Sequence, residues 1–257
     1  IFGNELKSEI SQKHKNDNVK CEVFKKYPEI YAKFGDRISG LKGKIVKLDN
    51  GKGKVLAGIP YYHQCDNNTI DGALNGNDRC QLTSLAMLLA SKEIKPKNQN
   101  RQFEDLLYEI AKNNGRGGSK LWDTVQTTYK KIIPNLKKND LIDCNGLVFD
   151  ESKGYFSEDE DFSIIISQID KGNPVIVDLK HGSKSQYGHV ILCIGYTETT
   201  LIIHDPYGNL EHGINNGYGG DKRDYNGSFI EYPKTKYKLG KNWIRFLEEA
   251  KNEKDND

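Results

Sequence analysis

Residues 77–89, NDRCQLTSLAMLL, predict a buried α-helix with a cysteine in its first turn. The apolar side chains recur at the i, i+3, i+4, i+7 spacing of one helix face, namely Leu82, Leu85, Ala86 and Leu89. Met87 and Leu88 widen this face beyond the stripe of an ordinary surface helix. We therefore expect the helix to lie at the centre of the fold.

Cys80 occupies the position of this helix where a thiol is most readily ionised. Asn77 or Asp78 can accept the amide protons that a helix start leaves unpaired, which places Cys80 in the first turn. The partial positive charge at a helix N-terminus favours the nucleophilic thiolate. A lone cysteine at the edge of an apolar helix is more often a small packed side chain, so a catalytic interpretation needs partners elsewhere in the chain.

The composition is that of a globular protein without a strong overall charge. The 257 residues are 36% hydrophobic and 29% charged, and a chain of this length can bury one large core or two small ones. Because 38 basic and 36 acidic residues nearly balance, we expect no nucleic-acid partner. No apolar run approaches the length that spans a membrane. The chain begins at Ile1 without a secretory signal, so we expect either an upstream segment that was removed or a piece of a larger protein.

The cysteines and histidines lack the spacing of a disulfide framework or a metal site. Five cysteines occur without a Cys-x-x-Cys pair, at positions Cys21, Cys65, Cys80, Cys144 and Cys193. Histidines and a cysteine that flank the expected site show no metal-binding spacing either, namely His63, Cys65, His181, His204 and His212. We therefore expect neither a metal nor an organic cofactor, and we expect His204 to face the side of its strand opposite to Asp205.

Helical patterns are concentrated in the first part of the chain and strand patterns in the last. Helices are predicted in an arm within residues 1–40 and at Phe103–Lys112, Trp122–Ile133, Phe162–Ile169 and Trp243–Ala250. Strands are predicted in a hairpin between Lys44 and Ile59, around Asn50-Gly51, and at 175–179, 189–196, 201–205 and 229–232. Helices followed by antiparallel strands indicate an α+β domain.

His189 opens one predicted strand and Asp205 closes the next. A hairpin turn centred on Thr197 would place the two residues directly opposite each other, with both side chains on one face. The carboxylate would then fix the tautomer of the imidazole and leave its other nitrogen free to take a thiol proton. Cys80, His189 and Asp205 thus combine a nucleophile, a base and an orienting group. Gln64, upstream of the cysteine helix, can donate its side-chain amide to an oxyanion together with the Cys80 backbone N–H.

The order Gln64, Cys80, His189, Asp205 resembles that of the papain superfamily of cysteine peptidases, and in particular its bacteriocin-processing (double-glycine leader) peptidase-like branch. The segments that carry the resemblance are 59–64 (IPYYHQ), 80–87 (CQLTSLAM), 172–177 (GNPVIV), 188–196 (GHVILCIGY) and 205–208 (DPYG). The resemblance implies a papain-like α+β fold, in which a helical lobe with the nucleophile packs on a mostly antiparallel sheet. It also implies Cys80 as nucleophile, His189 as base, Asp205 as orienter and Gln64 as oxyanion donor.

We expect three parts in the chain. Residues 1–55 would form an accessory helical arm and hairpin, residues 56–250 the papain-like domain, and residues 251–257 a charged tail. Two features depart from the family pattern. Gln81 follows the nucleophile where the family usually has glycine, and the loop from Gln64 to Cys80 is longer than in transporter-linked leader peptidases.

The long loop argues against a leader peptidase of bacteriocin export and favours the broader group of related peptidases. That group includes secreted hydrolases and cell-wall-degrading domains of phage and bacterial proteins. The expected function is therefore a cysteine hydrolase of amide bonds that acts on bacterial cell-wall peptides (peptidoglycan) or on proteins and is secreted or phage-associated. Two alternatives remain open. One is a non-catalytic binding module on the papain scaffold, and the other is an acyl-transfer enzyme such as a deamidase or a transglutaminase.

Overall fold

The computed structural model describes ten segments of the chain, namely residues 44–48, 52–64, 79–98, 102–113, 142–143, 155–156, 162–179, 189–209, 227–235 and 244–247. The predicted arm at 1–40 and the predicted helix Trp122–Ile133 lie outside these segments, as do Asn77 and Asp78. Within them, no helix is both long and apolar enough to cross a membrane.

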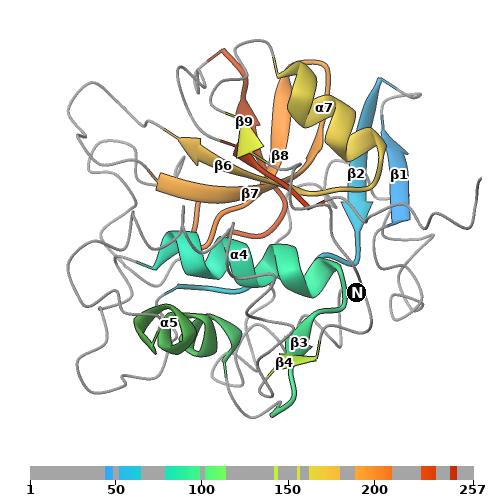
Figure 1. Ribbon diagram of the computed structural model, residues 1–257. Helices are drawn as coiled ribbons and strands as arrows, with labels where there is room; N and C mark the ends of the chain where they lie inside the picture. The colour runs from blue at the N-terminus through green and yellow to red at the C-terminus, as the bar shows by residue number, and fades with distance from the viewer. Residues whose placement is uncertain are drawn as a thin grey trace, which may run out of the picture.

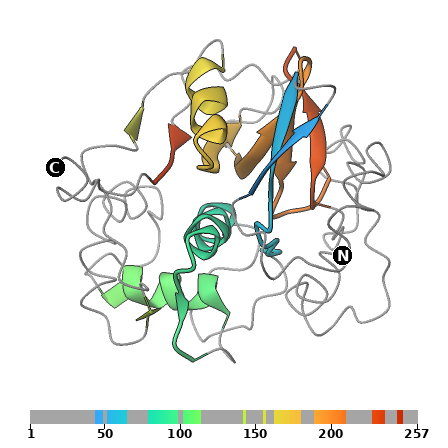
Figure 2. The same cartoon turned by 90° about the vertical axis from the view of Figure 1, so that its right-hand side faces the viewer.

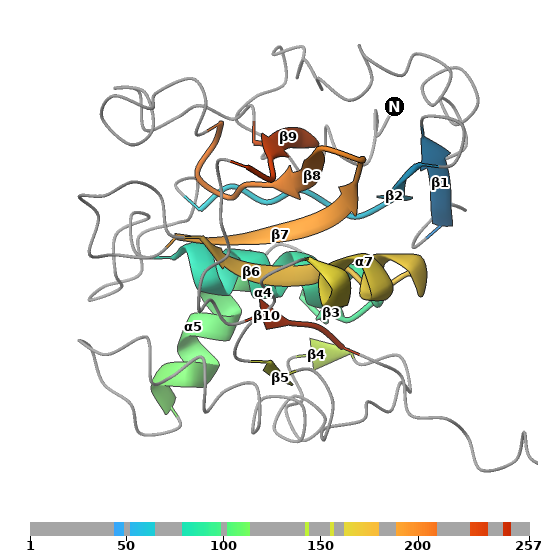
Figure 3. The same cartoon turned by 90° about the horizontal axis from the view of Figure 1, so that it is seen from above.

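The described strands form one eight-stranded antiparallel sheet and one small two-stranded sheet. The main path runs through β1 (Lys44–Leu48), β2 (Gly53–Ala57), β7 (His189–Tyr196), β6 (Val175–Leu179), β10 (Ile244–Arg245) and β5 (Tyr155–Phe156). From β7 the sheet also continues into β8 (Thr200–His204) and β9 (Ile230–Pro233), as Figure 3 shows. The small sheet pairs β3 (Lys95–Pro96) with β4 (Ile142–Asp143). Strand β7 is therefore the centre of the main sheet, because it pairs with β2, β6 and β8.

Helix α4 (Cys80–Ser91) confirms the expectation of a central helix, because all 12 of its residues are buried. It packs along β7 and β6, while α5 (Phe103–Asn113) packs against α4 (Figure 1). Figure 2 views α4 nearly along its axis, with α5 below it and the strands of the main sheet above. Helix α7 (Ser163–Asp170) packs on β2, β6 and β7. The α+β architecture predicted from the sequence is thus present, and the start of α4 faces the strands that follow it in the chain.

The predicted hairpin between Lys44 and Ile59 is confirmed by the pairing of β1 with β2, from Lys44 opposite Ala57 to Leu48 opposite Gly53. Strand β2 then pairs with β7, where the two backbones approach closely at Gly195. A Cβ atom at Gly195 would lie 2.5 Å from the backbone oxygen of Lys54, so only glycine fits there. Among the strands that the structure describes, β1 pairs only with β2 and so lies at an edge of the main sheet. The domain boundary expected after residue 55 stays a prediction.

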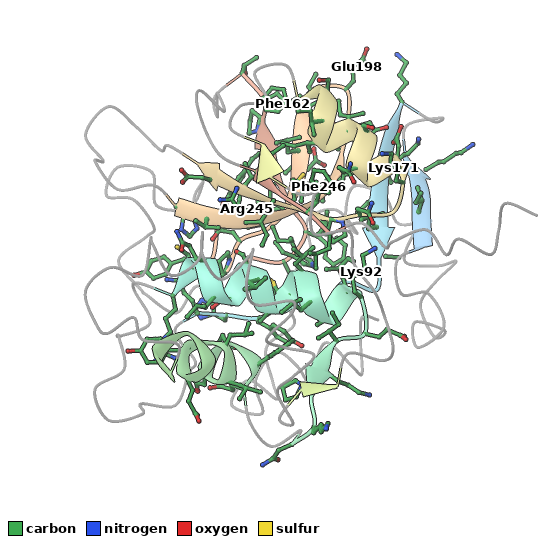
Figure 4. The ribbon with its side chains drawn as sticks, viewed as in Figure 1. Lys92, Phe162, Lys171, Glu198, Arg245 and Phe246 are labelled. Atoms are coloured by element: carbon green, nitrogen blue, oxygen red, sulfur yellow. The ribbon has the colours of Figure 1, made fainter. Side chains whose placement is uncertain are left out.

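The helix predicted at Trp243–Ala250 is wrong at residues 244–247. Ile244 and Arg245 form β10, in which Ile244 pairs with Val177 on one side and with Phe156 on the other. The four successive residues from Ile244 to Leu247 are all buried. A surface helix would turn part of such a run towards solvent, whereas an extended segment between two strands buries every residue. Figure 4 shows Arg245 and Phe246 in the interior of the molecule, and Lys92 at the far end of α4 from Cys80.

Candidate active site

Cys80 is the first residue of α4. The N-cap residue is Arg79, whose side chain does not cap the helix, and the first turn contains no acidic residue. The Thr83 N–H donates to the Arg79 carbonyl at 2.9 Å, which closes the first turn. Cys80 is 9% exposed and its thiol is not in a disulfide. The positive end of the helix dipole therefore acts directly on a free thiol.

Arg79 fixes the start of α4 against α5. Its guanidinium is buried and donates to the Asp105 carboxylate on α5, and it lies 5.3 Å from the centre of the Tyr108 ring. Removing either partner of a buried ion pair leaves an uncompensated charge and typically costs about 3–5 kcal/mol. The backbone of Cys80 is thus held by the residue before it. The sequence pattern gave no signal for this pair, because the two residues lie on different helices.

A second contact fixes α4 against β7. The Ser84 hydroxyl donates to the Val190 carbonyl at 3.1 Å. Ser84 lies one helical turn after Cys80, and Val190 directly follows His189. Ser84 therefore ties the helix that carries the cysteine to the strand that carries the histidine.

His189 and Asp205 are in direct contact, as the sequence predicted. The His189 Nε2 lies 2.8 Å from Asp205 Oδ1, and both side chains are buried. Because Asp205 occupies Nε2, Nδ1 is the nitrogen left to face Cys80. Burial alone would lower the pKa of His189, but the charge and hydrogen bond of Asp205, together with the Cys80 side chain, raise it to about 10. The imidazole is therefore held in its protonated form beside the thiol.

The strand register predicted for the hairpin of β7 and β8 is wrong, although the predicted contact between His189 and Asp205 is present. The turn is closed by the Thr197 N–H, which donates to the Thr200 carbonyl at 2.9 Å, and β7 has a bulge between Cys193 and Gly195. As a result His204 pairs with Leu192, whereas a turn centred on Thr197 would have paired it with Val190. The carboxylate reaches His189 from a turn just beyond the end of β8, not from the ladder itself.

The Asp205 carboxylate is saturated by donors from three parts of the chain. Besides His189, its Oδ1 accepts the Tyr207 N–H at 2.9 Å, and its Oδ2 accepts the Tyr232 hydroxyl at 2.6 Å. Tyr232 comes from β9, a segment whose sequence predicts only a strand. A tyrosine in a strand pattern is usually a packing residue, so the sequence contained no signal for this bond.

Gln64 belongs to a segment that runs beside Asp205. The Gln64 N–H donates to the Pro206 carbonyl at 2.8 Å, and the Tyr61 hydroxyl donates to the Asp205 carbonyl at 2.8 Å. The Gln64 side chain is buried. Gly227 completes the packing, because a Cβ atom there would collide with the Asp205 carbonyl oxygen and the Tyr61 hydroxyl. The four predicted residues thus gather where the start of α4, the start of β7 and the end of β8 meet residues 59–64.

His204, the last residue of β8, has a structural role. Its Nε2 donates to the Ile59 carbonyl at 3.1 Å, and its Nδ1 accepts the Phe229 N–H at 3.1 Å. Burial lowers the pKa of His204 to about 3, although its backbone partners oppose the shift. The neutral imidazole therefore joins residues 59–64 to the strands that carry Asp205 and Tyr232. His63 packs edge-on against Tyr61, and His181, His212 and Cys65 lie outside the described segments.

We expect His204 to make the protein less stable in acid. Its pKa is near 6.5 in the unfolded chain and about 3 in the folded chain, so its neutral form stabilises the fold above pH 6.5. Between pH 6 and pH 4 this stabilisation should decrease by about 1.4 kcal/mol per pH unit. Denaturant unfolding of the parent and of His204→Asn should therefore show a steeper loss in the parent over this range. Parallel curves for the two proteins would contradict the assignment.

The site lies within a region that a family model recognises. The model of the Peptidase_C39 like family matches residues 56–237, a range that includes Gln64, Cys80, His189, Asp205 and Tyr232. Among solved structures, a protein from Bacillus anthracis described as a C39-like peptidase matches with 16% sequence identity and a TM-score of 0.41. That match covers 77% of this chain and 98% of the other. No curated protein matches the chain.

Proposed function

Because the chain belongs to the Peptidase_C39 like family of papain-like cysteine peptidases, we propose that Cys80, His189, Asp205 and Gln64 form the active site of an amide-bond hydrolase. The observation that carries the proposal is the 2.8 Å contact between His189 and Asp205, made by an imidazole whose pKa the Cys80 side chain also raises. A nucleophile beside a base that a third group orients is the arrangement of covalent acyl-transfer catalysis.

In the first half of the reaction, the Cys80 thiolate attacks the carbonyl carbon of the substrate. The carbonyl electrons move to its oxygen, where the Cys80 backbone N–H and the Gln64 side-chain amide would donate to the negative charge. The tetrahedral intermediate then collapses and its C–N bond breaks. His189 gives its Nδ1 proton to the leaving amine, and the acyl group remains on Cys80 as a thioester.

In the second half, neutral His189 takes a proton from water, and the resulting hydroxide attacks the thioester. The new intermediate expels the Cys80 thiolate and releases a carboxylic acid, so that the thiolate and the imidazolium are both restored. Asp205 keeps Nε2 engaged in both halves, which orients Nδ1 towards the reacting atoms. Asp205 itself exchanges no proton in this sequence.

We propose peptides of the bacterial cell wall as the leading substrate and proteins as the second. The support is the resemblance to the broader peptidase group and the long loop between Gln64 and Cys80, which differs from the spacing of transporter-linked leader peptidases. Because one fold serves many substrates, the substrate has to be tested on the site itself.

The test is to incubate the protein with purified bacterial cell walls and, separately, with a denatured protein, and to identify the products by mass spectrometry. Release of wall peptides with new carboxyl ends would support a cell-wall peptidase, and cleavage of the denatured protein alone would support a general peptidase. Ammonia without chain cleavage would indicate a deamidase, and a mass gain with an added amine would indicate a transglutaminase. No product, together with a Cys80 that alkylates slowly near neutral pH, would favour a binding module.

A further inference from the structure

We propose that Tyr232 is a positioning residue of this active site, which holds the Asp205 carboxylate in the orientation that His189 requires. The proposal rests on the proposed function, since it concerns the same cysteine and histidine. It adds to the site a residue of β9 that the sequence pattern does not mark as functional.

The geometry of the carboxylate carries the argument. Oδ1 of Asp205 faces the His189 Nε2 at 2.8 Å, while Oδ2 accepts the Tyr232 hydroxyl at 2.6 Å. The two oxygens lie in one plane and turn together about the same side-chain bond. A donor on Oδ2 therefore also fixes the direction in which Oδ1 points. Because hydrogen bonds to ionised groups are short and strong, Tyr232 is well placed to prevent this rotation.

Tyr232 is itself held rigidly. It pairs with Leu201 in the ladder between β8 and β9, and its side chain is only 1% exposed. At the start of β9, the Phe229 N–H donates to His204 Nδ1, on the residue before Asp205. The hydroxyl thus has a position that the register of the sheet determines, and it faces a carboxylate that is completely buried.

The titratable groups around the Asp205 carboxylate come from several elements. Among the described residues they include His189 of β7, Tyr232 of β9 and Tyr61 of residues 59–64. Tyr207, whose N–H binds Oδ1, lies with its ring edge-on to His189, and Cys80 of α4 acts through His189. If the carboxylate turns away from His189, the imidazolium loses part of the negative charge that stabilises it. The thiolate then forms at a higher pH, because it depends on that imidazolium as its counter-ion.

Tyr61 provides a matched control. Its hydroxyl also donates to Asp205 at 2.8 Å, but to the backbone carbonyl and not to the carboxylate. Tyr61 and Tyr232 are both almost fully buried. Tyr61→Phe and Tyr232→Phe therefore each remove one buried hydroxyl that binds the same residue, and only the second removes a bond to the carboxylate.

The experiment measures the rate at which iodoacetamide alkylates Cys80 between pH 4 and pH 10, with the Cys80 peptide quantified by mass spectrometry. We expect both phenylalanine variants to lower the melting temperature to a similar extent. Only Tyr232→Phe should raise the pH of half-maximal alkylation, by about one pH unit. Identical profiles for Tyr232→Phe and Tyr61→Phe would overturn the proposal.

A double-variant test is available if Tyr232→Phe alone is too unstable to measure. In an Asp205→Asn background the carboxylate that Tyr232 would orient is absent, so Tyr232→Phe should cause no further shift of the profile beyond that of Asp205→Asn. A persisting shift would overturn the proposal. The readout needs no substrate, so it separates this proposal from the proposed function. A parent protein whose Cys80 alkylates only near the pH of an ordinary thiol would contradict the proposed function, whatever Tyr232 does.

Discussion

Replacing Cys80 with alanine should reduce the rate of product release by about 10⁴- to 10⁶-fold, because no other described group can form the acyl intermediate. The fold should survive, since the change removes one sulfur atom at a position that is still 9% exposed. The measurement is the initial rate of product release under identical conditions for the parent and Cys80→Ala, together with their melting temperatures.

Cys193→Ala is the matched control for this experiment. Cys193 is also a buried cysteine outside any disulfide, but it lies within β7, and its Sγ donates to the Gly195 carbonyl. Its replacement should lower stability more than activity. If both alanine variants kept the parent's rate, Cys80 would not be the nucleophile and the hydrolase mechanism would have to be abandoned.

Replacing His189 with alanine should reduce the rate by about 10⁴-fold and should also change the reactivity of Cys80. With its pKa raised to about 10, His189 stays protonated near neutral pH, and Cys80 contributes to this shift. In His189→Ala the alkylation of Cys80 should instead follow an ordinary thiol, with half-maximal rate near about pH 8.5. Alkylation at a series of pH values, with Cys80 identified by mass spectrometry, measures this difference.

His189 should also make the free energy of unfolding depend on pH, in the direction opposite to that caused by His204. The folded pKa of His189 lies above its unfolded value, so its contribution is fully present below about pH 6.5 and is lost as the pH rises towards 10. The free energy of unfolding should therefore fall more steeply from pH 7 to pH 9 in the parent than in His189→Ala. His204→Asn serves as the control, because it should leave this alkaline slope unchanged. A parent whose alkylation profile matches that of His189→Ala would rule out His189 as the partner of Cys80.

Local sequence patterns predicted those parts of the fold that depend on neighbouring residues. The apolar spacing of residues 80–89 gave the central helix, and Asn50-Gly51 between apolar runs gave the first hairpin. The strands β6, β7 and β8 followed from continuous apolar runs, which suit strands that are buried on both faces. These features succeed because hydrophobic periodicity and turn residues act over short distances along the chain.

The errors arise where distant parts of the chain determine the outcome. Trp243–Ala250 has a composition that suits a helix, but between β5 and β6 the extended form of Ile244 and Arg245 completes two ladders at once. The bulge between Cys193 and Gly195 moved the register of the second hairpin, and nothing in the local pattern marks it. The contact of His189 with Asp205 was still predicted, because it needed only that the two strand ends meet.

Arg79 and Tyr232 show which contacts of the site cannot be predicted from the sequence. Arg79 directly precedes Cys80 and binds Asp105, and Tyr232 binds Asp205. In each pair the two residues lie at least 26 positions apart in the sequence. Arginine and tyrosine have many uses in a buried position, so their residue type does not reveal the contact. Cysteine, histidine and aspartate at strand and helix ends are more informative, because few structural roles require that combination.

The hydrogen bonds between residues 59–64 and residues 204–206 also determine at which stage of folding the site is assembled. The Tyr61 hydroxyl and the Asp205 carbonyl are 144 positions apart, and His204 and Ile59 are 145 apart. Contacts of such high contact order form late in folding, because a long loop must close before they add stability. Until then Gln64 and Asp205, the proposed oxyanion donor and orienting carboxylate, are not held together by these bonds. The site is therefore complete only after these long-range contacts have formed, late in folding.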